Sequence, residues 1–270
     1  MTQQHSSDLE RRFGGLARLY GTEGAARIRA ARVAVVGIGG VGSWAAEALA
    51  RSGVGAITLV DLDNVAESNV NRQIHALTST LGQPKVEAMR QRIALIHPGC
   101  EVHCVEDFAA PGNWPALLPA AVDGVIDACD QVHAKQALAA WALKTRALFI
   151  TCGAAGGKRQ GERVEIADLA EVTHDPLMAA LRARLRQTGS MAKGGKDGKD
   201  RQARSGLHVV FSREAVTRPA ACGPQPGHDR NLNCHGYGSA VTVTATFGLV
   251  AAGWMLERLA QGGALQHPHT

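Results

Sequence analysis

The segment from Arg32 to Ser52 constrains the fold more than any other part of the chain. The run Arg32-Val-Ala-Val-Val-Gly37 is almost wholly apolar, which is typical of a strand buried on both faces. Gly37, Gly39 and Gly42 then have the spacing G-x-G-x-x-G, and residues 43–52 carry apolar side chains at helical intervals. A second apolar run, 56–60, follows. The sequence therefore predicts a βαβ unit with a right-handed crossover.

Strand and helix patterns continue to alternate along the chain. A short helix, 23–31, is predicted before the first strand. After the βαβ unit we expect helices at 85–96 and 131–145, and strands at 101–105, 124–128, 148–151, 163–169 and 207–212. This alternation predicts an α/β fold: a Rossmann-like, doubly wound, mostly parallel sheet with a C-terminal extension of strands and a helix.

Composition narrows the class of protein. The chain has 270 residues, 45% of them hydrophobic and 20% charged, which fits an ordered globular protein. Its six cysteines form no C-x-x-C pair, so we expect free thiols and no paired zinc site. The polar N-terminus predicts no secretory signal and hence a cytoplasmic setting.

Residues 239–255 are nearly all apolar or small and predict a helix that is buried in the core or touches a membrane.

The positive charge is concentrated in one segment. The net charge is +5, whereas 182–204 alone carries eight basic and two acidic residues, or +6, so the rest sums to −1. Such a segment can bind a nucleic-acid backbone, or it can be a solvated loop, as its glycines suggest. The candidate nucleic-acid-binding residues in this basic loop are Arg182, Arg184, Arg186, Lys193, Lys196, Lys199, Arg201 and Arg204.

The glycine loop predicts a nucleotide, unless it is a turn without a ligand. Its first two glycines allow the turn and a close approach by phosphate, and the third allows helix and strand to pack. Asp61 stands 19 residues after Gly42, at the end of the next strand, where a carboxylate can hold both ribose hydroxyls. The loop alone does not separate NAD from ATP.

Polar residues in the connection beyond the second strand, and at the end of the strand 124–128, favour ATP. Arg72 and Lys85 can neutralise phosphates, and Asp130 can hold Mg²⁺ that bridges phosphate oxygens. The alternatives are solvated helix charges for the two cations and a helix N-cap for Asp130. Because strand ends open into one crevice, we expect Asp61 and Asp130 to share it.

These motifs together resemble the ubiquitin-activating-enzyme-like adenylating superfamily, to which ThiF and MoeB proteins belong. The resemblance implies that ATP and Mg²⁺ are bound and a carboxylate is adenylated. It implies phosphate contacts from Asn69, magnesium at Asp130, and catalytic roles for Arg72, Lys85 and Asp130. The implied ATP-binding residues are Gly37, Gly39, Gly40, Gly42, Asp61, Asp63, Asn69, Arg72, Gln73, Lys85 and Asp130.

The runs 12–21, 40–51, 71–77 and 241–248 narrow the resemblance to the group that dehydrates threonylcarbamoyladenosine in tRNA. It implies a homodimer that acts on tRNA bearing this nucleoside. The domains would be a helical lead-in at 1–31, an ATP-binding core at 32–160 and a C-terminal substrate and dimer region at 161–270. The chain departs from the sulfur-carrier activators in lacking zinc pairs, and Gly14 and Gly15 stand where those proteins have an arginine, which makes Arg18 the candidate substitute.

Cys234 is the one thiol with a proposed role, since it lies in the polar stretch 231–236. The resemblance makes it a possible acceptor of sulfur from a cysteine desulfurase system, although the intramolecular chemistry does not need it. Three other functions remain open. They are activation of a ubiquitin-like or sulfur-carrier protein, an NAD-dependent dehydrogenase, and a non-catalytic nucleotide-binding scaffold that docks a desulfurase.

Overall fold

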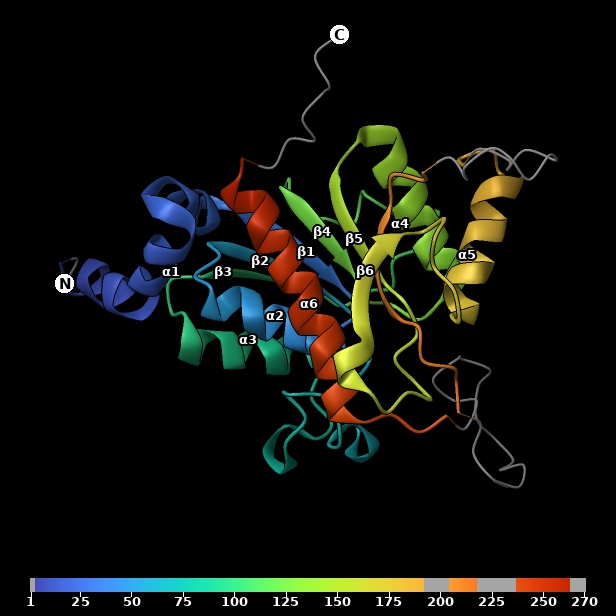
Figure 1. The fold of residues 1–270 in the computed structure, drawn as a ribbon. Coiled ribbons are helices and arrows are strands. Elements are labelled where there is room, and N and C mark those ends of the chain that lie inside the picture. Colours follow the sequence, from blue (N-terminus) through green and yellow to red (C-terminus); the bar gives the residue numbers. More distant parts are fainter. Residues whose placement is uncertain (1–2, 192–203, 218–236, 263–270) are drawn as a thin grey trace, which may run out of the picture.

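A computed structural model describes residues 3–191, 204–217 and 237–262 of the chain. Its centre is a seven-stranded sheet in the order β3-β2-β1-β4-β5-β7-β6 (Figure 1). The strands are β1 (Arg32–Val36), β2 (Ala56–Val60), β3 (Glu101–Val105), β4 (Gly124–Asp127), β5 (Leu148–Cys152), β6 (Val164–Asp168) and β7 (His208–Ser212). All neighbours are parallel except β6 and β7, which confirms the predicted mostly parallel α/β sheet.

Helices cover both faces of this sheet, as Figure 1 shows. The face with α6 packs Val33, Val35 and Ile57 of the sheet in one apolar cluster, and the opposite face packs Ala34, Val36 and Val125 in another. Alternate residues of each strand thus point into different clusters, as the period of a strand requires. The helices are α1 (Gln3–Ala30), α2 (Gly42–Arg51), α3 (Lys85–Ile96), α4 (Val132–Thr145), α5 (Pro176–Gln187) and α6 (Val241–Ala260), with short 3₁₀ turns η1 (Glu67–Asn69), η2 (Thr78–Thr80) and η3 (Gly161–Arg163).

The lead-in helix is longer than the predicted 23–31. It begins at Gln3 and is kinked at Gly21, whose φ is 75°. Its first half has a reason to fold against the protein, because Phe13 is buried there and packs edge-on against His97 at a ring distance of 4.8 Å.

The segment 182–204 was predicted to be a basic loop, and its first part is instead the end of α5. Leu177, Leu181 and Leu185 recur at helical spacing and are buried against the sheet and α4, and they hold this stretch in a helix. Arg182, Arg184 and Arg186 therefore stand on a helix. Lys193, Lys196, Lys199 and Arg201 lie outside the described residues.

The apolar C-terminal segment forms α6 and belongs to the core. Val243, Phe247, Ala251 and Met255 are fully buried along its inner face, in the cluster that covers the sheet. The predicted contact with a membrane finds no support in the structure. Within the parts of the chain that the structure describes, no helix combines the length and the apolar character that crossing a bilayer requires.

Candidate functional site

A cavity of about 1200 Å³ opens at the carboxyl ends of the parallel strands. Residues that follow β1, β2, β3, β4 and β5 line it, as expected for the ligand crevice of a doubly wound sheet. Asp61 and Asp130 share this cavity, which confirms that prediction. The other predicted site residues that line it are Gly37, Gly39, Gly40, Asp63, Asn69, Arg72, Gln73 and Lys85.

Gly42 does not line the cavity but makes the glycine loop possible. A Cβ at this position would overlap the carbonyl oxygen of Gly37, so only glycine lets α2 start this close to the end of β1. Asp61 fixes the loop from the other side, because its Oδ2 accepts a hydrogen bond of 2.6 Å from the backbone N–H of Ile38. The loop is therefore held open toward the cavity by backbone packing and one buried carboxylate.

Asp61, Asp63 and Lys85 form a charged cluster at the end of β2. Lys85 Nζ lies 2.6 Å from Asp63 Oδ2 and 3.7 Å from Asp61 Oδ1. Burial raises the pKa of the Asp61 carboxyl, and the neighbouring Lys85 charge opposes that rise. Lys85 is itself only 6% exposed although it lines the cavity. A cation placed in this way can meet an anion that enters the cavity.

Arg72 and its neighbours are positioned by a compact turn after β2. The guanidinium Nη1 of Arg72 donates to the carbonyl of Ser68 at 2.7 Å, while its own carbonyl accepts from Trp44 Nε1 at 2.9 Å. Asn69 Oδ1 accepts from the N–H of Ala66 at 2.9 Å and stabilises the turn. Gln73 Oε1 is buried at the cavity wall and has no hydrogen-bond partner among the described residues. The turn therefore presents one cation and one unsatisfied acceptor to a ligand.

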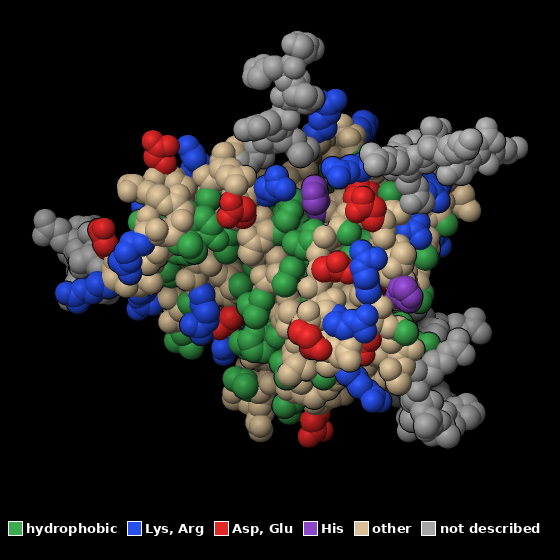
Figure 2. Space-filling view, in the orientation of Figure 1, with side chains coloured by type: hydrophobic (Ala, Val, Ile, Leu, Met, Phe, Trp, Pro, Cys, Tyr) green, Lys and Arg blue, Asp and Glu red, His purple; other side chains and the backbone are tan. Residues whose placement is uncertain are grey.

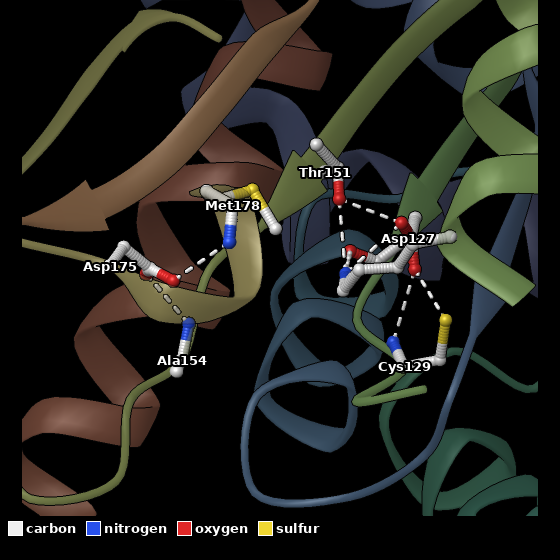
Figure 3. Close-up of polar contacts among 7 residues, drawn as sticks. Asp127, Cys129, Thr151, Ala154, Asp175 and Met178 are labelled. Atoms are coloured by element: carbon white, nitrogen blue, oxygen red, sulfur yellow. Dashed lines mark hydrogen bonds and ion pairs between the residues drawn. The ribbon is translucent and has the colours of Figure 1, made fainter. Parts of the chain in front are cut away.

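Asp130 follows β4 on the turn that leads to α4. The N-cap of α4 is Gln131, without a side-chain cap bond, so the alternative reading of Asp130 as the N-cap is wrong. A buried network underlies the turn. Asp127 Oδ2 accepts from Thr151 Oγ1 at 2.7 Å and from Lys135 Nζ at 3.0 Å, and its Oδ1 accepts from the Cys129 backbone N–H and thiol (Figure 3).

Lys135 is the main residue of this region that sequence analysis missed. Its side chain and that of Asp127 are both 0% exposed. Burial lowers the pKa of the Lys135 ammonium, but the neighbouring groups together, led by the charge and hydrogen bond of Asp127, outweigh this effect and the pKa lies above its ordinary value. One signal was present in the sequence. Lys135 shares a helical face with Leu138, Ala139 and Ala142, which predicts a buried position for it.

Thiols near this network are protonated. Burial raises the pKa of Cys152 to about 12, and burial with the adjacent Asp127 raises the pKa of Cys129 well above its usual range. Cys152 is buried in β5, as expected for a packed thiol. Neither group is poised to act as a thiolate nucleophile. Cys234 lies outside the described residues.

The β5 end of the cavity is built from the 153–157 turn and the start of α5. Asp175 caps α5 by accepting from the Met178 N–H at 3.0 Å, and its second oxygen accepts from the Ala154 N–H at 2.9 Å (Figure 3). The 4% exposed Asp175 thereby ties the helix start to the turn. Tyr237 lines the cavity beside this turn.

The predicted tRNA-binding arginines differ in availability. Arg182 Nη1 donates to the carbonyls of Leu169 and Val172 at 2.9 and 3.0 Å, so this guanidinium is engaged within the fold. Burial, with the nearby Arg186 charge, lowers the pKa of Arg182. Arg184 and Arg204 are exposed. Arg18 is exposed on α1 and does not line the cavity of its own chain.

Comparison with known proteins decides the family. The model of the ThiF family matches residues 13–268. The chain belongs to the ThiF family. It is 42% identical to the tRNA threonylcarbamoyladenosine dehydratase of Escherichia coli, over 97% of this chain and 98% of that protein. It is 39% identical to the Haemophilus influenzae protein of the same name, over 93% and 94%.

A solved structure extends this similarity to the fold. The crystal structure of the E. coli tRNA N6-threonylcarbamoyladenosine dehydratase in complex with ATP superposes with a TM-score of 0.84 at 41% identity, covering 97% of this chain and 99% of that one. The likeness spans nearly the whole ThiF-family chain, including the C-terminal half that carries β6, β7 and α6.

Proposed function

We propose that this ThiF-family chain catalyses the ATP-dependent dehydration of N6-threonylcarbamoyladenosine in tRNA by adenylating the threonyl carboxylate. One observation carries the proposal: a single cavity gathers Asp61, Arg72, Lys85 and Asp130 in a chain that is similar over its whole length to dehydratases of that name. A hydride-transfer site needs neither the two cations nor the second carboxylate.

In this reaction a carboxylate oxygen attacks the α-phosphorus of ATP, and pyrophosphate leaves with the electron pair of the broken P–O bond. The carbamoyl nitrogen or oxygen of the same side chain then attacks the acyl carbon, and AMP leaves with the former carboxylate oxygen. The carbamoyl group gives up one N–H proton to solvent as the ring closes, so the modified side chain loses the elements of water, with its oxygen leaving in AMP. Both reacting groups are on one substrate, so proximity favours closure and no enzyme nucleophile is needed.

The residues of the cavity supply binding and charge. Asp61 would hold the ribose hydroxyls, and the N–H groups of the glycine loop, with Asn69 and Gln73, would contact the phosphates. Arg72 and Lys85 would neutralise the charge that develops as one anion attacks another, because fixed cations cost no reorganisation in the transition state.

Mg²⁺ fits this cavity only together with the nucleotide. No three His, Cys, Asp or Glu side chains in the described part of the chain lie close enough to hold a metal by themselves. Mg²⁺ is commonly bound by one or two carboxylates and by substrate phosphates, and Asp130 provides one such carboxylate at the cavity wall. When bound, the ion would offset phosphate charge.

Two exposed arginines support the contact with tRNA. Arg184 and Arg204 are free to face a phosphate backbone on the side of α5 and β7, whereas Arg182 serves the fold. The basic residues 193–201 lie between them in the sequence and outside the described residues. The combined positive charge of these basic residues favours a contact with the tRNA phosphates, and this contact should weaken as the salt concentration rises.

We also propose a homodimer. Hydrophobic side chains gather over α6 in Figure 2, and Val241 and Leu249 of that helix are 38% and 48% exposed. Arg18 is outside the cavity of its own chain, so in a dimer it can serve only the cavity of the second copy. Sedimentation analysis should give a dimer that Leu249→Arg weakens; a monomer at all concentrations would contradict this proposal.

Cys234 remains the proposed acceptor of sulfur from a cysteine desulfurase system. The dehydration steps do not use a thiol, so Cys234→Ser should keep full dehydration activity. It should lose only transfer of labelled sulfur from the desulfurase. Equal labelling of the variant and the parent chain would remove this role.

Nucleoside mass spectrometry tests the proposed function. tRNA bearing threonylcarbamoyladenosine is incubated with the protein, ATP and Mg²⁺, and Asp130→Ala is the control. The proposal predicts loss of one water from the modified adenosine and no loss with the control. An unchanged nucleoside despite measured ATP binding would instead favour activation of a carrier protein or a scaffold role.

A further inference from the structure

The residues of the cavity wall lie in a row across the sheet, in the order of the strands that they follow. Phe108 follows β3, Asp61 follows β2, the glycine loop follows β1, Asp130 follows β4, and the 153–157 turn follows β5. Four strand spacings separate β3 from β5 in this sheet, which at about 4.8 Å each makes the wall roughly 19 Å long. The cavity is thus long enough for two ligands side by side.

The proposed nucleotide residues occupy only part of this wall. Asp61 marks the ribose position at β2, and the glycine loop and Asp130 mark the phosphates at β1 and β4. The nucleoside end of ATP then points toward β3, where Phe108 lies. The β5 end of the cavity, between the 153–157 turn and the start of α5, is left for the second substrate.

An aromatic ring forms one wall of this β5 end. Phe108 and Tyr237 are the aromatic side chains among the described residues of the cavity wall, and they stand at its two ends. The Tyr237 ring lies against Gly157, where its Cδ1 would be 3.3 Å from an added Cβ. Gly157 has a φ of 74°, so both its space and its backbone favour glycine.

Backbone hydrogen bonds hold Tyr237 in this position. The N–H of Gly157 donates to the carbonyl of Gly238 at 2.8 Å, and the N–H of Thr217 donates to the carbonyl of Gly157 at 2.8 Å. Asp175 fixes the neighbouring N–H of Ala154, and Pro176 and Leu177 complete an apolar wall. A rigid aromatic ring beside apolar side chains suits the flat face of a nucleobase.

We propose that Tyr237 is a stacking platform for the purine ring of the acceptor nucleoside, which binds at the β5 end of the cavity. This assignment rests on the proposed function. The acceptor carboxylate must reach the α-phosphorus near Asp130, and only a short side chain joins that carboxylate to its base. The base therefore lies within one side-chain length of Asp130, and the β3 end already holds the adenine of ATP.

Steady-state kinetics of three variants test the platform. The substrates are tRNA bearing threonylcarbamoyladenosine and ATP·Mg²⁺, each varied separately. Tyr237→Ala should lower kcat/KM for the tRNA by about tenfold or more, as for the loss of one base stack, and leave the KM for ATP within about twofold. Tyr237→Phe should recover most of that loss, because it keeps the ring.

The matched control is Tyr20→Ala, since Tyr20 is the chain's other tyrosine and does not line the cavity. Tyr237→Ala with the kcat/KM of the parent chain, or with a KM for ATP that rises in parallel, would overturn the assignment. Failure of Tyr237→Phe to recover activity would also overturn it, by pointing to the hydroxyl group. No water loss with the parent chain would refute the proposed function itself, a result distinct from all of these.

Discussion

Two lysine–aspartate clusters lie at the carboxyl ends of β2 and β4, the strands on either side of β1, and differ in their access to the cavity. Lys135 and Asp127, between α4 and β4, are sealed, with both side chains 0% exposed. Lys85 pairs with Asp61 and with Asp63, whose side chain is 56% exposed, and all three residues line the cavity. The same two residue types therefore serve a closed network in one place and an open one in the other.

This difference in access indicates a structural role for the Lys135 cluster and a catalytic role for the Lys85 cluster. The ammonium of Lys135 donates to Asp127 and to Thr151, and the other Asp127 oxygen accepts from Cys129, so that network holds the end of β4 and the turn that carries Asp130. Lys85 reaches its aspartates and also faces space that an anion can enter. We expect mutations in the sealed cluster to reduce stability and mutations in the open cluster to reduce activity.

The largest expected effect on stability is from Lys135→Met. It leaves the Asp127 carboxylate buried without its cation, which typically costs about 3–5 kcal/mol of unfolding free energy. Urea unfolding measures this loss. The control is Lys144→Met, an exposed lysine on the same helix, which should change stability by about 0.5 kcal/mol or less. Equal effects of the two variants would contradict the sealed-cluster account.

Lys85→Met should reduce activity more than stability. Removal of a cation that stabilises developing phosphate charge should lower kcat by about 10²–10³-fold. Its stability loss should be smaller than that of Lys135→Met, because Asp63 is exposed and Asp61 keeps its bonds from the backbone N–H groups of Ile38 and Asp63. Single-turnover AMP formation and urea unfolding on the same sample separate the two effects. A variant that unfolds readily but turns over normally would reverse the comparison.

The buried ring of His75, near the charge of Lys85, should make the free energy of unfolding depend on pH. Its ring is buried, and burial, with the charges of Lys85 and Arg92, lowers its pKa to about 4. Between pH 6.5 and 4 the unfolded chain binds a proton that the folded chain does not, so stability falls as the pH falls through this window and levels off below it. The full loss is about 3 kcal/mol.

Urea unfolding at several pH values measures this contribution. His75→Leu should flatten the curve across that window, whereas His133→Leu, at an exposed position on α4, should leave it unchanged. The same slope in the parent chain and His75→Leu would show that His75 is not the titrating group.

The smallest effect on activity is expected at α5, where an exposed arginine and an arginine bound within the fold differ in the same way as the two lysines. Arg184→Glu reverses an exposed charge and should raise the KM for tRNA a few-fold, with a salt slope reduced by at least about 1, while the KM for ATP stays constant. Arg182→Ala should instead lower the melting temperature, because its bonds to two carbonyls are lost. An unchanged KM and salt slope for Arg184→Glu would remove this arginine from the tRNA contact.

Sequence alone placed the open cluster but not the sealed one. Asp61 and Asp130 follow apolar runs, and strand ends of a parallel sheet meet in one crevice, so their convergence was predictable, while Lys85 begins the helix predicted after the second strand. Lys135 was missed because a lysine is ordinarily assigned to the surface, and its burial depends on a partner from another element. Tyr237 was missed for a related reason, since its place beside the 153–157 turn is set by tertiary contacts.

The secondary structure likewise has parts that could be predicted from the sequence and parts that depend on tertiary contacts. The strands could be read from their apolar runs. The helix α5 could not, because two arginines between its leucines and a third directly after the last one obscured the apolar period and made the stretch resemble the start of a charged loop. The first half of α1 likewise depends on the burial of Phe13 against distant residues.

The central claim is that the acceptor carboxylate attacks the α-phosphorus of ATP, and isotope transfer tests it most directly. The threonyl carboxylate of threonylcarbamoyladenosine in tRNA is labelled with ¹⁸O, the reaction is run to completion, and the nucleotide products are analysed by mass spectrometry. Adenylation predicts that AMP carries one ¹⁸O atom per molecule of cyclised base. Labelled inorganic phosphate accompanied by ADP, or AMP without label, would contradict the account.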